Sequence, residues 1–195
     1  ACFIDQPPVA VDVVRHAGEA VAVVIAKTGH QAQAALSKIK VQYESLPYVL
    51  DPIEAMAPDA PLVHEHVENY WRVESAAFPI PGTNVFHHYK LRKGDREKGF
   101  SESDVIVESD FEFPLSNHAA LEPHGAICRF DAKGGSIEIW ASQQGPFILR
   151  YVLSGMFKIE TSKIRVHSPY LGGGFGGKSD VAMEPLVAWA ASFVP

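Results

Sequence analysis

The alternation of hydrophobic and polar residues predicts a small α/β unit at the beginning of the chain. It predicts strands over 11–15 and 20–26, a helix over 30–38 and a half-exposed strand over 39–44. Thr28 is expected to cap the helix, because its hydroxyl can accept a hydrogen bond from a free backbone N–H of the first turn.

Residues 58–84 contain prolines and aromatic residues but no regular hydrophobic period, which is typical of a connector. The sequence therefore predicts a first domain over 1–57, a connector over 58–84 and a second domain over 85–195. We expect both domains to be truncated, since the sequence lacks an initiator methionine and its last predicted helix runs into the end of the chain.

In the second domain the same patterns predict five strands, two helices and two turns. The strands cover 86–92, 105–113, 126–131, 136–141 and 163–167, the helices 146–155 and 181–193, and one turn 133–135. The other, 94–100, is predicted to be a charged turn or a short helical turn. Pro146 suits the first turn of its helix, where a missing N–H costs no hydrogen bond.

Composition narrows the classes of function. The chain has 195 residues, 47% of them hydrophobic, and a formal net charge of -6, which is ordinary for a globular protein and does not favour nucleic-acid binding. Its two cysteines, Cys2 and Cys128, lie far apart and in no metal-binding spacing, which fits a reducing compartment. The sequence contains neither a secretory signal pattern nor a membrane-spanning apolar stretch, so a cytoplasmic protein is expected.

The most unusual stretch is 172–177, in which five of six residues are glycine. Such a stretch is costly in a regular element, but it exposes backbone to a ligand between a predicted strand and a predicted helix. Residues 172–179 also fit the phosphate-loop pattern G-x-x-x-x-G-K-S, with Lys178 on phosphate and Ser179 on magnesium. Too few residues follow to supply the acidic partner of that motif, and a purely structural loop is a further alternative.

Two other segments are candidates for a site. Gln143 and Gln144 lie where a strand meets a helix, a position that suits either ligand binding or helix capping. Residues 117–124 contain His118, Glu122 and His124, but their spacing matches no closed zinc site, so shaping a pocket is favoured over binding a metal.

The chain as a whole resembles the molybdenum-binding subunit of the xanthine dehydrogenase and aldehyde oxidase family. The resemblance is carried, in this order, by residues 18–24, 39–51, 94–105, 118–123, 141–144 and 172–178. It implies an α+β fold, in which a small α/β hammerhead domain precedes part of a mixed α/β molybdopterin-binding domain.

The resemblance also implies roles for single residues. Gln144 resembles the glutamine that hydrogen-bonds the apical oxygen of the molybdenum centre, and Phe175 and Gly176 resemble the pair whose backbone lies against it. The other cofactor-binding residues are expected to be Gly173, Gly174 and Gly177. No metal ligand is expected in the chain, and the family's general-base glutamate lies further along than its last residue.

The implied protein is an oxidoreductase that uses water to hydroxylate a small organic substrate. Xanthine-type members carry a purine-contacting glutamate where this chain has Ser179, so an aldehyde, an N-heteroaromatic compound or an acyl thioester is favoured as substrate. The expected cofactor is molybdenum–molybdopterin, and iron–sulfur clusters and FAD are expected on partner subunits or domains of an oligomer. We expect this fragment to be inactive alone. A phosphate-loop nucleotide-binding protein and a non-catalytic interaction module are the alternatives.

Overall fold

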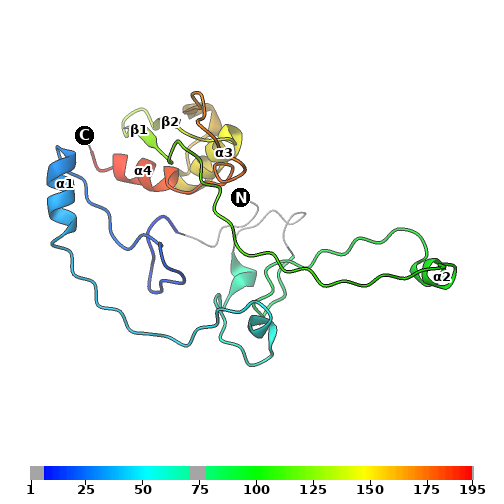
Figure 1. Cartoon of the computed structure of the whole chain (residues 1–195). Coiled ribbons are helices and arrows are strands. Elements are labelled where there is room, and N and C mark those ends of the chain that lie inside the picture. The colour runs from blue at the N-terminus through cyan, green and yellow to red at the C-terminus, as the bar shows by residue number, and fades with distance from the viewer. Residues whose placement is uncertain (1–6, 71–77, 195) are drawn as a thin grey trace.

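The computed structural model describes residues 7–70 and 78–194, and its core is a three-stranded sheet with two helices. The strands β1 (Ala126–Asp131), β2 (Ser136–Ala141) and β3 (Ile164–His167) lie side by side in that order. β1 and β2 are antiparallel, whereas β2 and β3 are parallel and are connected through α3 (Pro146–Phe157) (Figure 1). The strands and the helix predicted in this part of the chain are confirmed, and so is the α+β class.

A tight turn joins β1 to β2 at the predicted position. Oδ1 of Asp131 accepts hydrogen bonds from the backbone N–H groups of Lys133 (3.0 Å) and Gly134 (2.9 Å). Gly135 then takes a left-handed conformation with φ 61°, which a glycine adopts without strain. Asp131 therefore pairs directly with Ser136, and this pairing sets the register of the hairpin.

The hydrophobic core lies on the inner face of the sheet, between the strands and the helices. Alternate residues of β2 point into it, as the period of two predicts, and Leu149 and Leu153 of α3 lie four positions apart on the facing side of the helix. The buried cluster consists of Ile137, Ile139, Ala141, Leu149, Leu153, Ile164 and Ala188. Half-buried Cys128 packs against it, and burial raises the pKa of this thiol to about 11. Cys2 lies outside the described residues.

The outer face of the sheet is polar and partly open. The rings of Trp140 and His167 stack at 4.9 Å, and Nε2 of His167 lies 3.0 Å from Oε1 of Glu138. Arg129 pairs with the other oxygen of Glu138. The hydrogen bond with His167 is the main cause that holds the pKa of Glu138 below its usual range.

The helix α4 (Glu184–Ala191) packs against β1 and α3 and closes the core. It is shorter than the predicted helix over 181–193. Pro185 lies in its first turn, and the buried carboxylate of Glu184 accepts a hydrogen bond from the backbone N–H of Ala182 (3.1 Å) just before the helix. Over the described ranges no helix is both long and apolar enough to span a bilayer.

Before the sheet the chain forms only short helices in the described residues. The predicted cap of α1 (Gly29–Leu36) is confirmed, since Oγ1 of Thr28 accepts a hydrogen bond from the N–H of Gln31 (3.2 Å). Of the two alternatives predicted near 94–100, the short helical one is confirmed as α2 (Arg96–Ser101), which Asp95 caps in the same way. Single 3-10 turns are η1 (Glu54–Met56), η2 (Val67–Asn69) and, after α3, η3 (Thr161–Lys163).

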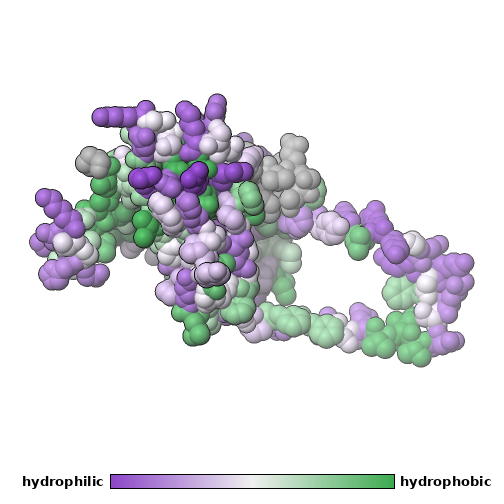
Figure 2. Space-filling model, turned by 90° about the horizontal axis from the view of Figure 1, so that it is seen from above, coloured by the Kyte–Doolittle hydropathy of each residue, from purple (hydrophilic) through white to green (hydrophobic). Residues whose placement is uncertain are grey.

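Five predicted strands are wrong, because the structure has no strand over 11–15, 20–26, 39–44, 86–92 or 105–113. A strand requires a neighbour for its N–H and C=O groups, and an alternating pattern does not say whether a neighbour is present. Many apolar residues of these segments stay exposed, for example Val107 (83%) and Phe113 (86%). The segments on either side of α2 form an extended arm in Figure 1, and Figure 2 shows apolar side chains in the open along this arm. The predicted connector, 58–84, lies partly outside the described residues.

Candidate functional site

The glycine-rich loop that follows β3 folds back on itself in two successive turns. The N–H of Gly177 donates to the carbonyl of Gly174 (2.8 Å), and the N–H of Ser179 donates to that of Gly176 (3.0 Å). Gly176 has φ 91°, and Phe175 beside it is a non-glycine residue with φ 53°. Since a side chain in this region is disfavoured, the surrounding contacts must hold Phe175 in place.

Several of the glycines are required by close packing. A Cβ atom on Gly172 would lie 2.6 Å from Cβ of Glu122, and one on Gly177 would lie 2.7 Å from Cγ of His118. A Cβ atom on Gly174 would lie 2.5 Å from Cδ of Gln144. A Cβ atom at any of these positions would force its neighbour to move, so the loop packs tightly against two segments that lie far from it in the chain.

The tip of the loop is open by contrast. Phe175 is 73% exposed, and the nearest atom to a Cβ placed on Gly176 would be Nε2 of His118, at 3.9 Å. The backbone of these two residues can therefore be approached closely by another molecule. The predicted cofactor-binding residues thus divide into a packed part, to which Gly174 and Gly177 belong, and an accessible part, Phe175 and Gly176. Gly173 has φ 99°, and its Cα faces the ring of Phe175.

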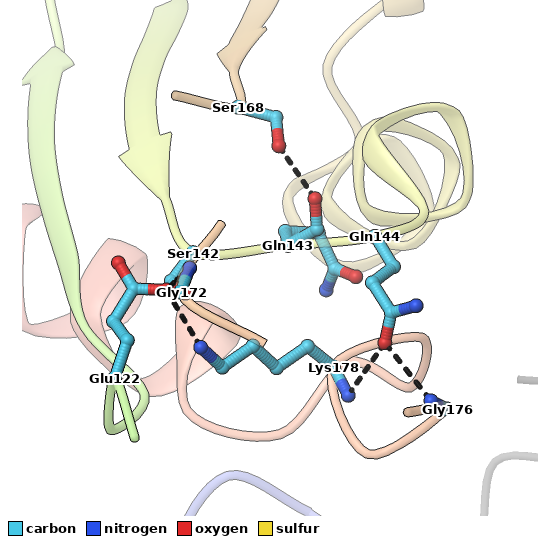
Figure 3. Close-up of polar contacts among 8 residues, drawn as sticks. All are labelled: Glu122, Ser142, Gln143, Gln144, Ser168, Gly172, Gly176 and Lys178. Carbon is cyan, nitrogen blue, oxygen red and sulfur yellow. Dashed lines mark hydrogen bonds and ion pairs between the residues drawn. The ribbon is translucent and has the colours of Figure 1, made fainter. Parts of the chain in front are cut away.

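Gln144 connects the end of β2 to this loop. Its Oε1 accepts hydrogen bonds from the backbone N–H groups of Gly176 (3.2 Å) and Lys178 (3.3 Å). Because both partners are donors, the oxygen must be the atom that faces them, and the amide nitrogen points away, as Figure 3 shows. Within the described part of the chain this nitrogen has no hydrogen-bond partner, and the side chain is exposed. It is therefore a fixed and available donor next to the loop tip.

Gln143 points the opposite way and is buried. Its Oε1 accepts a hydrogen bond from the N–H of Gly145 (2.9 Å), and its Nε2 donates to Glu184 (3.3 Å) and to the carbonyl of Asp180 (3.2 Å). Its own carbonyl accepts a hydrogen bond from the hydroxyl of Ser168 (2.5 Å). Gln143 thus bonds Gly145, the residue just before α3, without capping the first turn of the helix, whereas Gln144 faces the loop, and its role in binding a ligand stays a prediction.

An ion pair between a buried lysine and a partly exposed glutamate holds the loop from its other side. Nζ of Lys178, whose residue is 1% exposed, lies 2.7 Å from Oε2 of Glu122. The same oxygen accepts hydrogen bonds from the hydroxyl of Ser142 (2.7 Å) and the N–H of Gly172 (2.9 Å), as Figure 3 shows. Hydrogen bonds from Lys178, then Ser142, then Gly172 lower the pKa of Glu122 from 4.5 to about 2. No pattern in the sequence indicates this pair, since its partners lie 56 positions apart.

This pair contradicts the phosphate-loop interpretation of the sequence. A phosphate loop needs the lysine ammonium to reach a phosphate, but Lys178 is buried and points to Glu122. A metal site built on Glu122 has no support either, and no group of three potential metal ligands occurs among the described residues.

The remaining candidates lie around the loop. His118 contacts Gly177, whereas His124 is exposed and away from that contact. Ser179 is half-buried at the end of the loop, and its carbonyl faces Gly145, where an added Cβ would lie 3.3 Å from it. The assignment of Ser179 to a substrate site stays a prediction.

Two family models match the chain. The model described as "Molybdopterin cofactor-binding domain" matches residues 78–194. The model described as "Aldehyde oxidase and xanthine dehydrogenase, a/b hammerhead domain" matches residues 3–47. The first match contains Gln144, Glu122 and the complete glycine loop.

Individual proteins and solved structures resemble this chain over nearly its whole length. A probable xanthine dehydrogenase subunit of Bacillus subtilis is 33% identical over 187 residues, which cover 96% of this chain and 23% of that protein. The carbon monoxide dehydrogenase large chain of Hydrogenophaga pseudoflava is 33% identical over 177 residues, or 89% and 22%. The crystal structure of quinoline 2-oxidoreductase from Pseudomonas putida 86 matches with a TM-score of 0.74 and 26% identity over 96% of this chain and 22% of that one. The chain therefore spans about a fifth of the length of the relatives it matches.

Proposed function

Because the chain belongs to the molybdopterin cofactor-binding family of aldehyde oxidases and xanthine dehydrogenases, we propose that it forms one wall of the cofactor site of a molybdenum hydroxylase. The observation that carries this proposal is the arrangement of Gln144 beside the loop tip. Its amide oxygen is held by the N–H groups of Gly176 and Lys178, so its amide nitrogen is left as a donor that faces outward.

These residues fit the cofactor by their chemistry. Oxygen and sulfur atoms around a metal accept hydrogen bonds, and the available group on Gln144 can only donate. Phe175 and Gly176 add accessible backbone next to this donor, where a bulky side chain would keep the cofactor away. Bound molybdenum–molybdopterin supplies the redox chemistry, while the protein supplies position and hydrogen bonds.

In this proposal each residue has a separate task. Gln144 donates one hydrogen bond to an acceptor atom of the cofactor and so fixes its orientation. The anchored oxygen prevents the amide from rotating, which makes the donor available without rearrangement when the cofactor binds. Gly174 and Gly177 let the loop pack closely enough to hold Phe175 and Gly176 at the surface.

For the whole protein we infer an oxidoreductase that hydroxylates an aldehyde, an N-heteroaromatic compound or a related small molecule with oxygen from water. Electrons then pass to iron–sulfur clusters and FAD on partner subunits or domains of a cytoplasmic oligomer. The names of the relatives mention xanthine, carbon monoxide and quinoline, so the family context supports several substrate classes. Ser179 at the end of the loop favours a substrate other than a purine.

The metal content of the purified full-length protein tests this function. We expect stoichiometric molybdenum together with a pterin, and we expect an aldehyde or quinoline to reduce the enzyme, visible as bleaching of the flavin and iron–sulfur absorbance. A folded protein that contains neither molybdenum nor pterin would contradict the proposal and favour an interaction module. Magnesium–ATP should not raise the melting temperature, since Lys178 is not accessible to a phosphate.

A further inference from the structure

One carboxylate oxygen of Glu122 joins three parts of the site. It accepts hydrogen bonds from Nζ of Lys178 (2.7 Å) at the end of the glycine loop, from the N–H of Gly172 (2.9 Å) at its beginning, and from the hydroxyl of Ser142 (2.7 Å) after β2. The backbone N–H of Glu122 also donates to the carbonyl of Gly172 (3.1 Å). A single side chain thus ties both ends of the loop to the sheet.

The lysine that Glu122 holds is one of the two residues whose backbone orients the Gln144 amide, and Gly176 is the other. The N–H of Lys178 donates to Oε1 of Gln144 (3.3 Å), and its carbonyl accepts a hydrogen bond from the N–H of Gln144 (2.8 Å). The side chain of Lys178 is thus anchored at Glu122 while its backbone holds the amide of Gln144. A displacement of the lysine side chain would therefore be passed to the donor that faces the cofactor.

We propose that Glu122 is a positioning residue of the cofactor site, which holds the glycine loop in its binding shape through Lys178 and thereby keeps the amide nitrogen of Gln144 directed outward. Glu122 itself need not touch the cofactor. The inference rests on the proposed function, because it presumes that Gln144 and the loop bind molybdenum–molybdopterin.

Charge explains why this contact is suited to positioning. The Lys178 side chain is buried, and a buried ammonium requires a nearby anion to remain stable. The carboxylate is kept ionised well below neutral pH, since its pKa lies at about 2. The loop is therefore fastened in the same way at every pH at which the enzyme is expected to work, and before any cofactor is bound.

The test compares two variants of the full-length enzyme. Glu122→Gln keeps the acceptor for Ser142 and Gly172 but leaves Lys178 buried without its counter-charge. The double variant Glu122→Gln/Lys178→Met removes that unpaired charge and fills the same space. Molybdenum per protomer, melting temperature and the rate of molybdenum release during dialysis are measured for each variant.

We expect Glu122→Gln to lower the melting temperature and to release molybdenum about 10- to 100-fold faster than the wild type, the usual effect of losing an outer partner of a metal site. The double variant should regain most of the melting temperature but still release molybdenum fast, which a purely stabilising role would not produce. Glu138→Gln is the matched control, because it loses a paired carboxylate on the outer face of the same sheet, and it should retain molybdenum.

The outcomes separate the two proposals. Wild-type release by the double variant at a restored melting temperature overturns the positioning role of Glu122 and leaves the cofactor site intact. If Glu122→Gln does not fold, the double variant alone decides the question. Wild-type protein that lacks molybdenum overturns the proposed function itself.

Discussion

Gln144 and Lys178 are hydrogen-bonded to each other in both directions. The N–H of Gln144 donates to the carbonyl of Lys178 (2.8 Å), and the N–H of Lys178 donates to the side-chain oxygen of Gln144 (3.3 Å). These two hydrogen bonds therefore join the segment after β2 to the end of the glycine loop. This double contact decides which atom of the Gln144 amide faces the solvent, and the predictions below follow from it and from its neighbours.

The substitution Gln144→Glu tests separately the two roles of the Gln144 amide, which are to accept hydrogen bonds from the loop and to donate one outward. In Gln144→Glu both loop N–H groups still find an acceptor, so the melting temperature of the full-length enzyme should change little. The outward donor is lost, however, and one preorganised hydrogen bond to a reacting centre contributes about 3 kcal/mol, or roughly a hundredfold in rate. Turnover per bound molybdenum measures the effect, and wild-type turnover would refute the assigned role.

Replacement of Gln143 should affect stability more than replacement of its neighbour. The sequence alone suggests Gln143→Ala as a mild control for Gln144→Ala, but Gln143 is buried and its amide bonds Gly145 and Glu184. Its removal leaves these groups unsatisfied, which costs about 1–3 kcal/mol of unfolding free energy. Urea unfolding of both alanine variants gives the comparison, and a larger loss in Gln144→Ala would contradict the structure.

Gly174→Ala should disturb the site, whereas Gly155→Ala should not. A Cβ on Gly174 would lie 2.5 Å from Cδ of Gln144 and would push the amide away, so we expect loss of molybdenum from the full-length enzyme. Gly155 lies inside α3 with open space around it, and alanine there should stabilise the helix by roughly 0.5–1 kcal/mol. Metal analysis and thermal unfolding of both variants test this, and full molybdenum content in Gly174→Ala would count against the close packing.

From the lowered pKa of Glu122 we predict that the stability of the folded protein depends on pH. Its pKa is depressed from 4.5 to about 2 in the folded state, so its contribution is complete above pH 4.5 and is lost as the pH falls toward 2. The difference in melting temperature between the wild type and Glu122→Gln should thus be constant from pH 8 to about pH 5 and shrink below it. A difference that stays constant down to pH 3 would show that the ion pair does not stabilise the fold.

The sequence determined those elements whose partners lie close by in the chain. β1, β2 and α3 occur where the hydrophobic pattern predicts them, because a short turn brings β2 back onto β1 and the helix covers the same face. Thr28 and Pro146 marked the beginnings of two helices correctly, since capping depends on one or two local groups. The segments over 86–92 and 105–113 have an equally clear alternation, but among the described residues neither belongs to a sheet, and a pattern cannot supply a partner strand.

For the site, the sequence determined that backbone is exposed on a glycine loop, but only the tertiary structure decided what the loop contacts. From the sequence, Lys178 could point to a ligand or into the protein. It points into the protein because it pairs with Glu122, which lies 56 positions away in the chain. Gln143 and Gln144 are identical in type and adjacent in sequence, yet one is buried and the other exposed. The two residues follow the end of β2, and only the tertiary structure places Glu184 beside Gln143 and Lys178 beside Gln144.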